Sequence, residues 1–203
     1  MVRLGLLASS RCPGTVIVHG LDVAIALKDA PITIVSGFQS PLETESLKFL
    51  LRGSVRLIVC PARSAAGMRI PAAWKKPMAD GRLTIRSFID EHCGIALLLD
   101  ARAAPSPRRA MPRRPTTDLA EQRNRFACAI SDAVLILHAS PNGKLERLAA
   151  ELMASGKQVW TLDDPANAML ISTGAKPIAP STVAAALVGG TESLNSFTKT
   201  HGA

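Results

Sequence analysis

Four short segments of the sequence carry the small, hydroxyl and basic residues that bind phosphate groups. Each follows an apolar run that predicts a β-strand, and several precede a predicted helix. The free N–H groups and the dipole at a helix N-terminus attract anions, and Arg11, Arg63 and Lys144 would add full positive charge. Because ligands of parallel α/β sheets bind beyond the carboxyl ends of the strands, the segments predict a phosphate-binding rim. They are Ser9–Arg11, Ser36–Ser40, Cys60–Arg63 and Ser140–Lys144.

Each segment also has a purely structural interpretation. The Ser40-Pro41 and Ser140-Pro141 pairs are typical of ordinary turns at the start of a helix, with serine as the N-cap. The sequence has neither a Gly-x-Gly-x-x-Gly motif nor a Walker phosphate loop, which disfavours ordinary dinucleotide or NTPase chemistry. The predicted phosphate rim therefore depends on the four segments taken together.

The charge of the chain favours a polyanionic partner. The 203 residues carry a formal net charge of +8 at pH 7, and the sequence pI is near 9.9. Seven arginines lie between Arg102 and Arg125 against two acidic residues, so this segment holds +5 of the net charge. Nucleic acid is one such partner, although a solvated surface run has the same composition. Aromatic residues make up only 3% of the chain, which disfavours binding built on aromatic stacking platforms.

Apolar runs and turn residues alternate along the chain in a pattern that predicts an α/β fold. Strand–helix–strand units with short links imply right-handed crossovers and a mostly parallel sheet with helices on both faces. The predicted strands are residues 3–8, 31–35, 55–60, 94–100, 132–139, 158–162 and 176–179. The predicted helices are residues 16–28 with Thr15 as N-cap, 41–51, 70–76, 117–130, 144–155, 166–172 and 181–188.

Two segments are predicted to lack regular structure. Four prolines stand among the arginines of residues 101–117, which predicts a mobile basic loop. The Gly/Ser/Thr-rich residues 189–203 predict a flexible tail. No linker divides the remainder, so residues 1–188 are expected to form one domain.

Composition also disfavours several classes of protein and site. No apolar run approaches the ~20 residues of a membrane helix, and the first residues are too short an apolar stretch for a secretory signal. We therefore expect a cytoplasmic protein with no membrane partner. No two of the four cysteines form a CxxC pair, so free thiols are expected, with no metal and no other cofactor. His19, His92 and His138 are isolated, as structural histidines usually are.

Residues 123–137, RNRFACAISDAVLIL, resemble the RNR…AGLSDAVVVVEA segment of DNA-processing protein A (DprA), also called Smf. Residues 148–160 resemble that family's A…LAAEQGREVFAVPG segment, and residues 173–178 resemble its DGA.LV segment. Residues 34–37 resemble its VVSG strand end, and residues 8–11 its VGSR first loop. The resemblance covers nearly the whole chain in order, most specifically over residues 123–160 and weakly over residues 64–116.

This resemblance implies an extended Rossmann fold, shared with the lonely-guy phosphoribohydrolases. In DNA-processing protein A a positive rim holds the phosphates of single-stranded DNA, and that family loads a RecA-type recombinase and forms homodimers. We therefore predict a non-catalytic protein that binds single-stranded DNA or a nucleotide. The residues predicted to contact phosphate are Ser10, Arg11, Ser36, Gly37, Gln39, Ser40, Arg63, Arg113, Arg114, Arg123, Asn124, Arg125, Ser140, Asn142, Gly143 and Lys144.

The sequence departs from that family's pattern in two motifs. The family's Ser-Gly-x-Ala-x-Gly-Ile-Asp motif is here SGFQSPLE, over residues 36–43. Its Gly-Ser-Leu turn is replaced by PNGK, over residues 141–144. The usual flanking helical domains of the family have no counterpart in the sequence.

Other interpretations stay open at this point. A nucleotide sensor or phosphoribohydrolase-like enzyme would need a carboxylate near a ribose, for which Glu43 and Glu146 are the candidates. Both positions equally suit a carboxylate that interacts with the helix dipole. A partner-binding subunit would dock an acidic protein on its Pro/Arg segment. The alternative for residues 123–125 is a helix surface patch in which an arginine pairs with Glu121.

Overall fold

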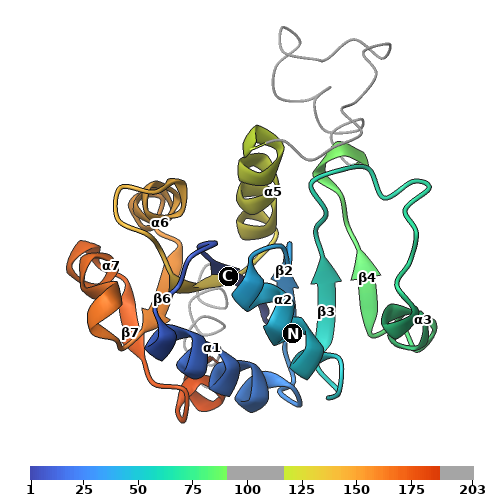
Figure 1. The fold of residues 1–203 in the computed structure, drawn as a ribbon, viewed down its shortest axis with the longest axis horizontal. Coiled ribbons are helices and arrows are strands. Elements are labelled where there is room, and N and C mark those ends of the chain that lie inside the picture. Colours follow the sequence, from blue (N-terminus) through green and yellow to red (C-terminus); the bar gives the residue numbers. More distant parts are fainter. Residues whose placement is uncertain (91–116, 188–203) are drawn as a thin grey trace, which may run out of the picture.

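The computed structural model describes residues 1–90 and 117–187 (Figure 1). Seven parallel strands form one sheet in the order β4-β3-β2-β1-β5-β6-β7. The chain therefore builds the sheet outward from β1 in one direction and then, from β5, in the other. The strands are β1 Arg3–Ala8, β2 Thr33–Ser36, β3 Arg56–Val59, β4 Leu83–Ile85, β5 Ala133–His138, β6 Gln158–Leu162 and β7 Lys176–Ile178.

Helices cover both faces of this sheet (Figure 1). Successive strand residues point to opposite faces, so Leu6 packs in the core with α1 and α2 while Leu7 packs in the core with α6. A third cluster joins Val35 of β2 to Phe126 of α5. The helices are α1 Gly14–Leu27, α2 Pro41–Leu50, α3 Ala72–Ala79, α5 Thr117–Ala129, α6 Lys144–Ala154 and α7 Ala168–Thr173, with a 3₁₀ turn at Pro165–Asn167 and a helical segment at 183–187.

The structure confirms the predicted α/β fold, with a sheet that is parallel throughout. Apart from shifts of up to three residues in the bounds of several elements, two features differ from the sequence-based prediction. Helix α1 begins at Gly14 and its N-cap is Pro13, so the N-cap predicted at Thr15 is wrong. The fixed φ of Pro13 suits the extended residue that precedes a helix, and the helix therefore begins before Thr15. Strand β4 was missed, since it is three residues long and only Leu83 is buried, too short an alternation to register as a pattern.

Three predicted features lie outside the described residues. They are the strand predicted at residues 94–100, most of the basic loop predicted at 101–117, and the tail predicted from residue 189. Within residues 1–90 and 117–187, no helix has the length and apolar character needed to cross a membrane. The same residues hold no group of His, Cys, Asp or Glu side chains that could bind a metal ion. Cys12, Cys60 and Cys128 are in no disulfide bond, and Cys93 lies outside the described residues.

Candidate nucleic-acid interface

The strand order reverses between β1 and β5, and the loops that follow these two strands form one end of the sheet. The parallel register places Ala8 beside His138. Beyond them the Ser9 N–H donates to the His138 carbonyl at 2.9 Å, and the Ser140 N–H donates to Ser9 Oγ at 2.9 Å. These bonds hold the two loops side by side. Such a switch point is where ligands of open α/β sheets bind.

Helix α1 begins at this switch point with free anion-binding groups. Its first turn contains no acidic residue, and no side chain caps its N-terminal N–H groups. Ser10 and Arg11, which precede the helix, are both exposed. Among the described residues Arg11 has no ion pair. The unsatisfied N–H groups, the helix dipole and the Arg11 charge together favour a bound anion.

Helix α6 begins on the other side of the switch point, and its end is partly occupied. No side chain caps the helix, whose N-cap is Gly143. Asn142 lies in the left-handed region with φ 59°, and its N–H donates to Glu146 Oε2 at 2.5 Å. The Gly143 N–H donates to the Ser140 carbonyl, which would lie 2.7 Å from any Cβ at position 143. The N–H groups of the first turn stay available, with the Glu146 carboxylate beside them.

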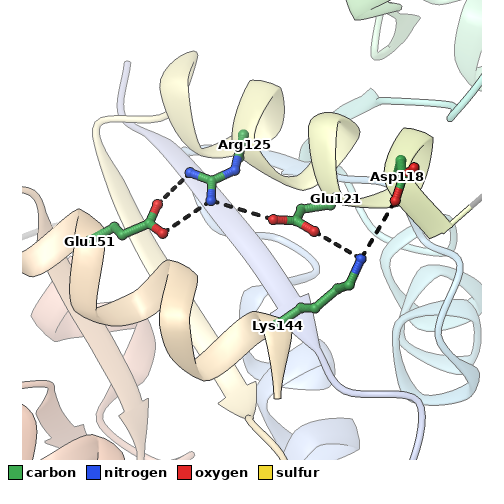
Figure 2. A network of polar contacts seen from close by, with 5 residues as sticks. All are labelled: Asp118, Glu121, Arg125, Lys144 and Glu151. Atoms are coloured by element: carbon green, nitrogen blue, oxygen red, sulfur yellow. Dashed lines mark hydrogen bonds and ion pairs between the residues drawn. The ribbon is translucent and has the colours of Figure 1, made fainter. Parts of the chain in front are cut away.

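Lys144 and Arg125, two of the predicted phosphate contacts, are engaged by carboxylates in a network that Figure 2 shows. The Lys144 ammonium lies 2.9 Å from Glu121 Oε2 and 3.8 Å from Asp118 Oδ1. Arg125 forms a two-pronged ion pair with Glu151 and reaches Glu121 Oε1 at 3.4 Å. The ion pair to Glu121 that the sequence suggested as an alternative for this segment is therefore present.

The two glutamates of this network, Glu121 and Glu151, each have a pKa below the ordinary value. The hydrogen bond from Lys144 is the largest cause of the lowered pKa of Glu121, and Arg125 adds to it. The hydrogen bond from Arg125 likewise lowers the pKa of Glu151. Both groups are thus ionised at neutral pH, where they neutralise the two basic side chains.

The loop after β2 is closed by its own carboxylate. Glu43 is 2% exposed, and its two oxygens accept N–H bonds from Ala8 at 2.8 Å, Gln39 at 2.9 Å and Ser40 at 3.4 Å. Ser40 Oγ in turn accepts the Glu43 N–H at 3.3 Å, which completes a capping box. The Ser36 hydroxyl accepts the Phe38 N–H at 3.0 Å. Three backbone N–H groups of this predicted phosphate loop, at Phe38, Gln39 and Ser40, are therefore already bonded within the protein.

Arg123, another predicted phosphate contact, lies beneath that loop. It is 5% exposed, and its Nε donates to Asn124 Oδ1 at 3.0 Å, while Nη1 has no hydrogen-bond partner. A Cβ at Gly37 would stand 2.2 Å from Nη1, so the guanidinium occupies the space where any side chain at position 37 would begin. Burial lowers the pKa of Arg123 and raises that of Glu43, while the attraction between the two charges opposes both shifts.

A cavity of about 310 Å³ opens beyond β2 and β3. Gly37, Gln39 and Arg63, all predicted site residues, line it. Arg69 and Trp74 line it as well, and the sequence prediction missed both. They come from the loop before α3 and from α3 itself, a stretch in which no motif pointed to a site. The one signal available was a tryptophan near two arginines in a chain poor in aromatic residues.

The structure thus divides the predicted residues into three groups. Those exposed at the switch point or the cavity are Ser10, Arg11, Gln39, Arg63, Asn142 and Lys144. Those with internal structural bonds or buried positions are Ser36, Gly37, Ser40, Arg123, Asn124, Ser140 and Gly143, and Arg125 is exposed but paired. Arg113 and Arg114 lie outside the described residues.

Comparison with known proteins identifies relatives by structure alone. No family model and no curated protein matches the sequence. DNA processing protein A from Streptococcus pneumoniae superposes with a TM-score of 0.63 at 16% identity, over 91% of this chain and 61% of that one. The Helicobacter pylori protein of the same name, whose structure concerns its single-stranded DNA binding mode, gives 0.64 at 16% identity, over 93% and 81%.

A third similar structure has a different function. The molybdenum cofactor carrier protein from Chlamydomonas reinhardtii superposes with a TM-score of 0.56 at 11% identity, over 93% of this chain and 98% of that one. The fold is therefore Rossmann-like, of the kind found in DNA processing protein A, as the sequence resemblance implied. This chain spans about 61% of the length of the Streptococcus pneumoniae protein.

Proposed function

We propose that this protein binds single-stranded DNA through its phosphates, without catalysis, in DNA processing, uptake or recombination. The open N-terminus of α1 beside exposed Arg11, at the point where the strand order reverses, is the observation that carries the proposal. The similarity to two structures of DNA processing protein A, one of them concerned with single-stranded DNA, supports it.

The phosphate track runs across the switch point from the α1 end to the α6 end. One phosphate rests on the first-turn N–H groups of α1 with Arg11 beside it. The next lies at the start of α6, where Lys144 exchanges its carboxylate partner for the phosphate. These groups contact the backbone of the strand and not its bases, so binding is indifferent to sequence and weakens steeply with salt.

The test is a titration of a single-stranded oligonucleotide at two salt concentrations. Arg11→Ala is expected to weaken binding several-fold and to reduce the slope of log affinity against log salt by roughly 0.7, the value for one phosphate contact on a single strand. Arg56→Ala is the matched control, since it removes the same charge from an exposed arginine at the opposite end of the sheet. Equal losses in the two variants, or an affinity that salt leaves unchanged, would refute the proposal.

A second candidate function is the binding of a small phosphorylated molecule such as a nucleotide. Its support is the superposition on nearly the full length of the molybdenum cofactor carrier protein. Glu43 is no candidate for substrate chemistry, because both its oxygens are buried against backbone N–H groups. Glu146, half-buried at the start of α6, is the carboxylate that a ligand at the switch point would meet. Release of free base from nucleoside monophosphates, lost in Glu146→Gln, would favour this candidate.

The assembly and partners of the protein extend the same proposal. We expect a cytoplasmic homodimer that engages a RecA-type recombinase on single-stranded DNA. Light scattering after gel filtration measures the oligomeric state directly. A pull-down with a RecA-type recombinase, with and without nuclease treatment, separates direct contact from bridging by DNA. An acidic partner protein captured regardless of nuclease would instead favour a partner-binding subunit.

A further inference from the structure

We infer that the cavity beyond β2 and β3 holds one nucleobase stacked on Trp74, with its phosphate between Arg63 and Arg69. This inference rests on the proposed function, because the nucleotide belongs to the bound strand, but the cavity lies apart from the switch point. Its lining comes from the segments after β2 and β3 and from the start of α3.

Trp74 has the position of a stacking platform. One part of its side chain packs against the core formed with α1 and α2, while the residue stays partly exposed and lines the cavity. Packing holds the ring in place, so little side-chain freedom is lost when a base stacks on the open part. Met68 and Pro61 add apolar lining. Stacking on an aromatic ring accepts every base, which suits a strand bound without sequence preference.

Among the residues that the structure describes, the positive charge at this cavity has no ion-pair partner, unlike the charge at the start of α6. Arg63 and Arg69 are exposed, and neither forms an ion pair with another described residue. Helix α3 begins at the cavity after Pro71, with no acidic residue in its first turn and no side-chain cap. Its free N–H groups and the two guanidinium groups together favour a phosphate next to the stacked base.

The floor of the cavity adds an observation of its own. Gly37 lines the cavity, and the buried Arg123 lies directly beneath it with an unpartnered Nη1. A buried N–H donor without a partner is costly for the folded protein, although the Glu43 carboxylate offsets the charge of this guanidinium. Position 37 carries no side chain, so the backbone itself forms this part of the cavity wall.

The experiment uses the intrinsic fluorescence of Trp74. The chain has two tryptophans, so Trp160→Phe leaves Trp74 as the only emitter. Three probes are titrated into this variant: a thymidine oligonucleotide, an oligonucleotide of the same length whose sugars carry no bases, and thymidine monophosphate. We expect the base-containing oligonucleotide to quench the emission, and the abasic one to bind without quenching.

Affinity measurements on Trp74→Leu complete the test. The loss of stacking is expected to weaken binding of the thymidine oligonucleotide by about five- to one-hundred-fold, and binding of the abasic strand by less than about twofold. Arg63→Ala and Arg69→Ala are each expected to lower the salt slope by roughly 0.7. If the leucine variant does not fold, the fluorescence titration on the Trp160→Phe variant decides alone.

The outcomes separate this inference from the proposed function. Strand binding that depends on Arg11 but leaves Trp74 emission unchanged would overturn the inference while the proposed function stands. Equal losses for base-containing and abasic strands in Trp74→Leu would also overturn it, since Trp74 would then be structural only. Quenching by thymidine monophosphate without any strand binding would support the cavity as a site for free nucleotides and would reject the proposed function.

Discussion

The N-termini of α1 and α2 lie after neighbouring strands at one edge of the sheet, yet only one of them is open to a ligand. At α2 the Glu43 carboxylate lies inside the protein and accepts the N–H groups of Ala8, Gln39 and Ser40. At α1 no acidic residue and no cap occupies the first turn. The two ends share a small-residue turn followed by a helix, and a carboxylate in the first turn decides which of them can receive a phosphate.

The largest effect on stability is expected when the Glu43 carboxylate is removed from the N-terminus of α2. In Glu43→Ala three buried or half-buried N–H groups lose their acceptor and Arg123 loses its opposite charge, so the free energy of unfolding should fall by roughly 3–5 kcal/mol. Urea unfolding measures it. Glu45→Ala, on the exposed face of the same helix, is the control and should change stability by less than about 0.5 kcal/mol. Similar losses of unfolding free energy in the two variants would mean that the Glu43 carboxylate does not stabilise the protein through these contacts.

A smaller loss of stability is expected when Gly37, which lies directly above Arg123, is replaced. A methyl group at position 37 would stand 2.2 Å from Nη1, so Gly37→Ala forces the buried guanidinium to move and should cost about 1–3 kcal/mol in stability. Gly14→Ala is the matched control, because a Cβ there meets nothing within 4 Å. Thermal unfolding of the two variants makes the comparison. Unchanged stability in Gly37→Ala would show that Arg123 does not fill that space.

The pH dependence of stability distinguishes the two ends further. Burial raises the pKa of Glu43 above its ordinary 4.5, so the native state binds this proton more readily than the unfolded chain does. The resulting stability is fully present below pH 4.5 and is lost as pH rises through the raised pKa. The wild-type protein should therefore gain stability relative to Glu43→Gln as the pH is lowered from neutral. A difference between the two proteins that does not change with pH would contradict the shift.

The smallest effect is expected at the N-terminus of α6. This terminus is partly occupied, whereas that of α1 is open and that of α2 is closed. Glu121→Gln removes the main carboxylate partner of Lys144 and should strengthen single-stranded DNA binding by about two- to fivefold. Glu151→Gln is the control, since its carboxylate pairs with Arg125 and not with Lys144. An equal gain in both variants would show a general charge effect in place of a specific release of Lys144.

Much of the fold could be predicted from the sequence, whereas the site could be predicted only in part. Apolar runs located β1 and β6 with their observed bounds, because buried parallel strands have an unambiguous pattern. Arg123 and Arg125 look alike in the sequence, but two residues turn a helix by about 200°, so one is buried under Gly37 and the other pairs with Glu151 on the surface. Trp74 lines the cavity because of the way α3 packs, and no local pattern in the sequence reveals that packing.

The most direct test of the open α1 end is a titration of the ¹⁵N-labelled protein with a thymidine oligonucleotide, followed by amide chemical shifts. The account predicts large shifts at Gly14, Thr15 and Val16, whose N–H groups would meet a phosphate, and small shifts at Ser40, whose N–H group already bonds to Glu43 and which does not line the cavity. Shifts confined to Ser40, or none at the start of α1 when the oligonucleotide is saturating, would contradict it.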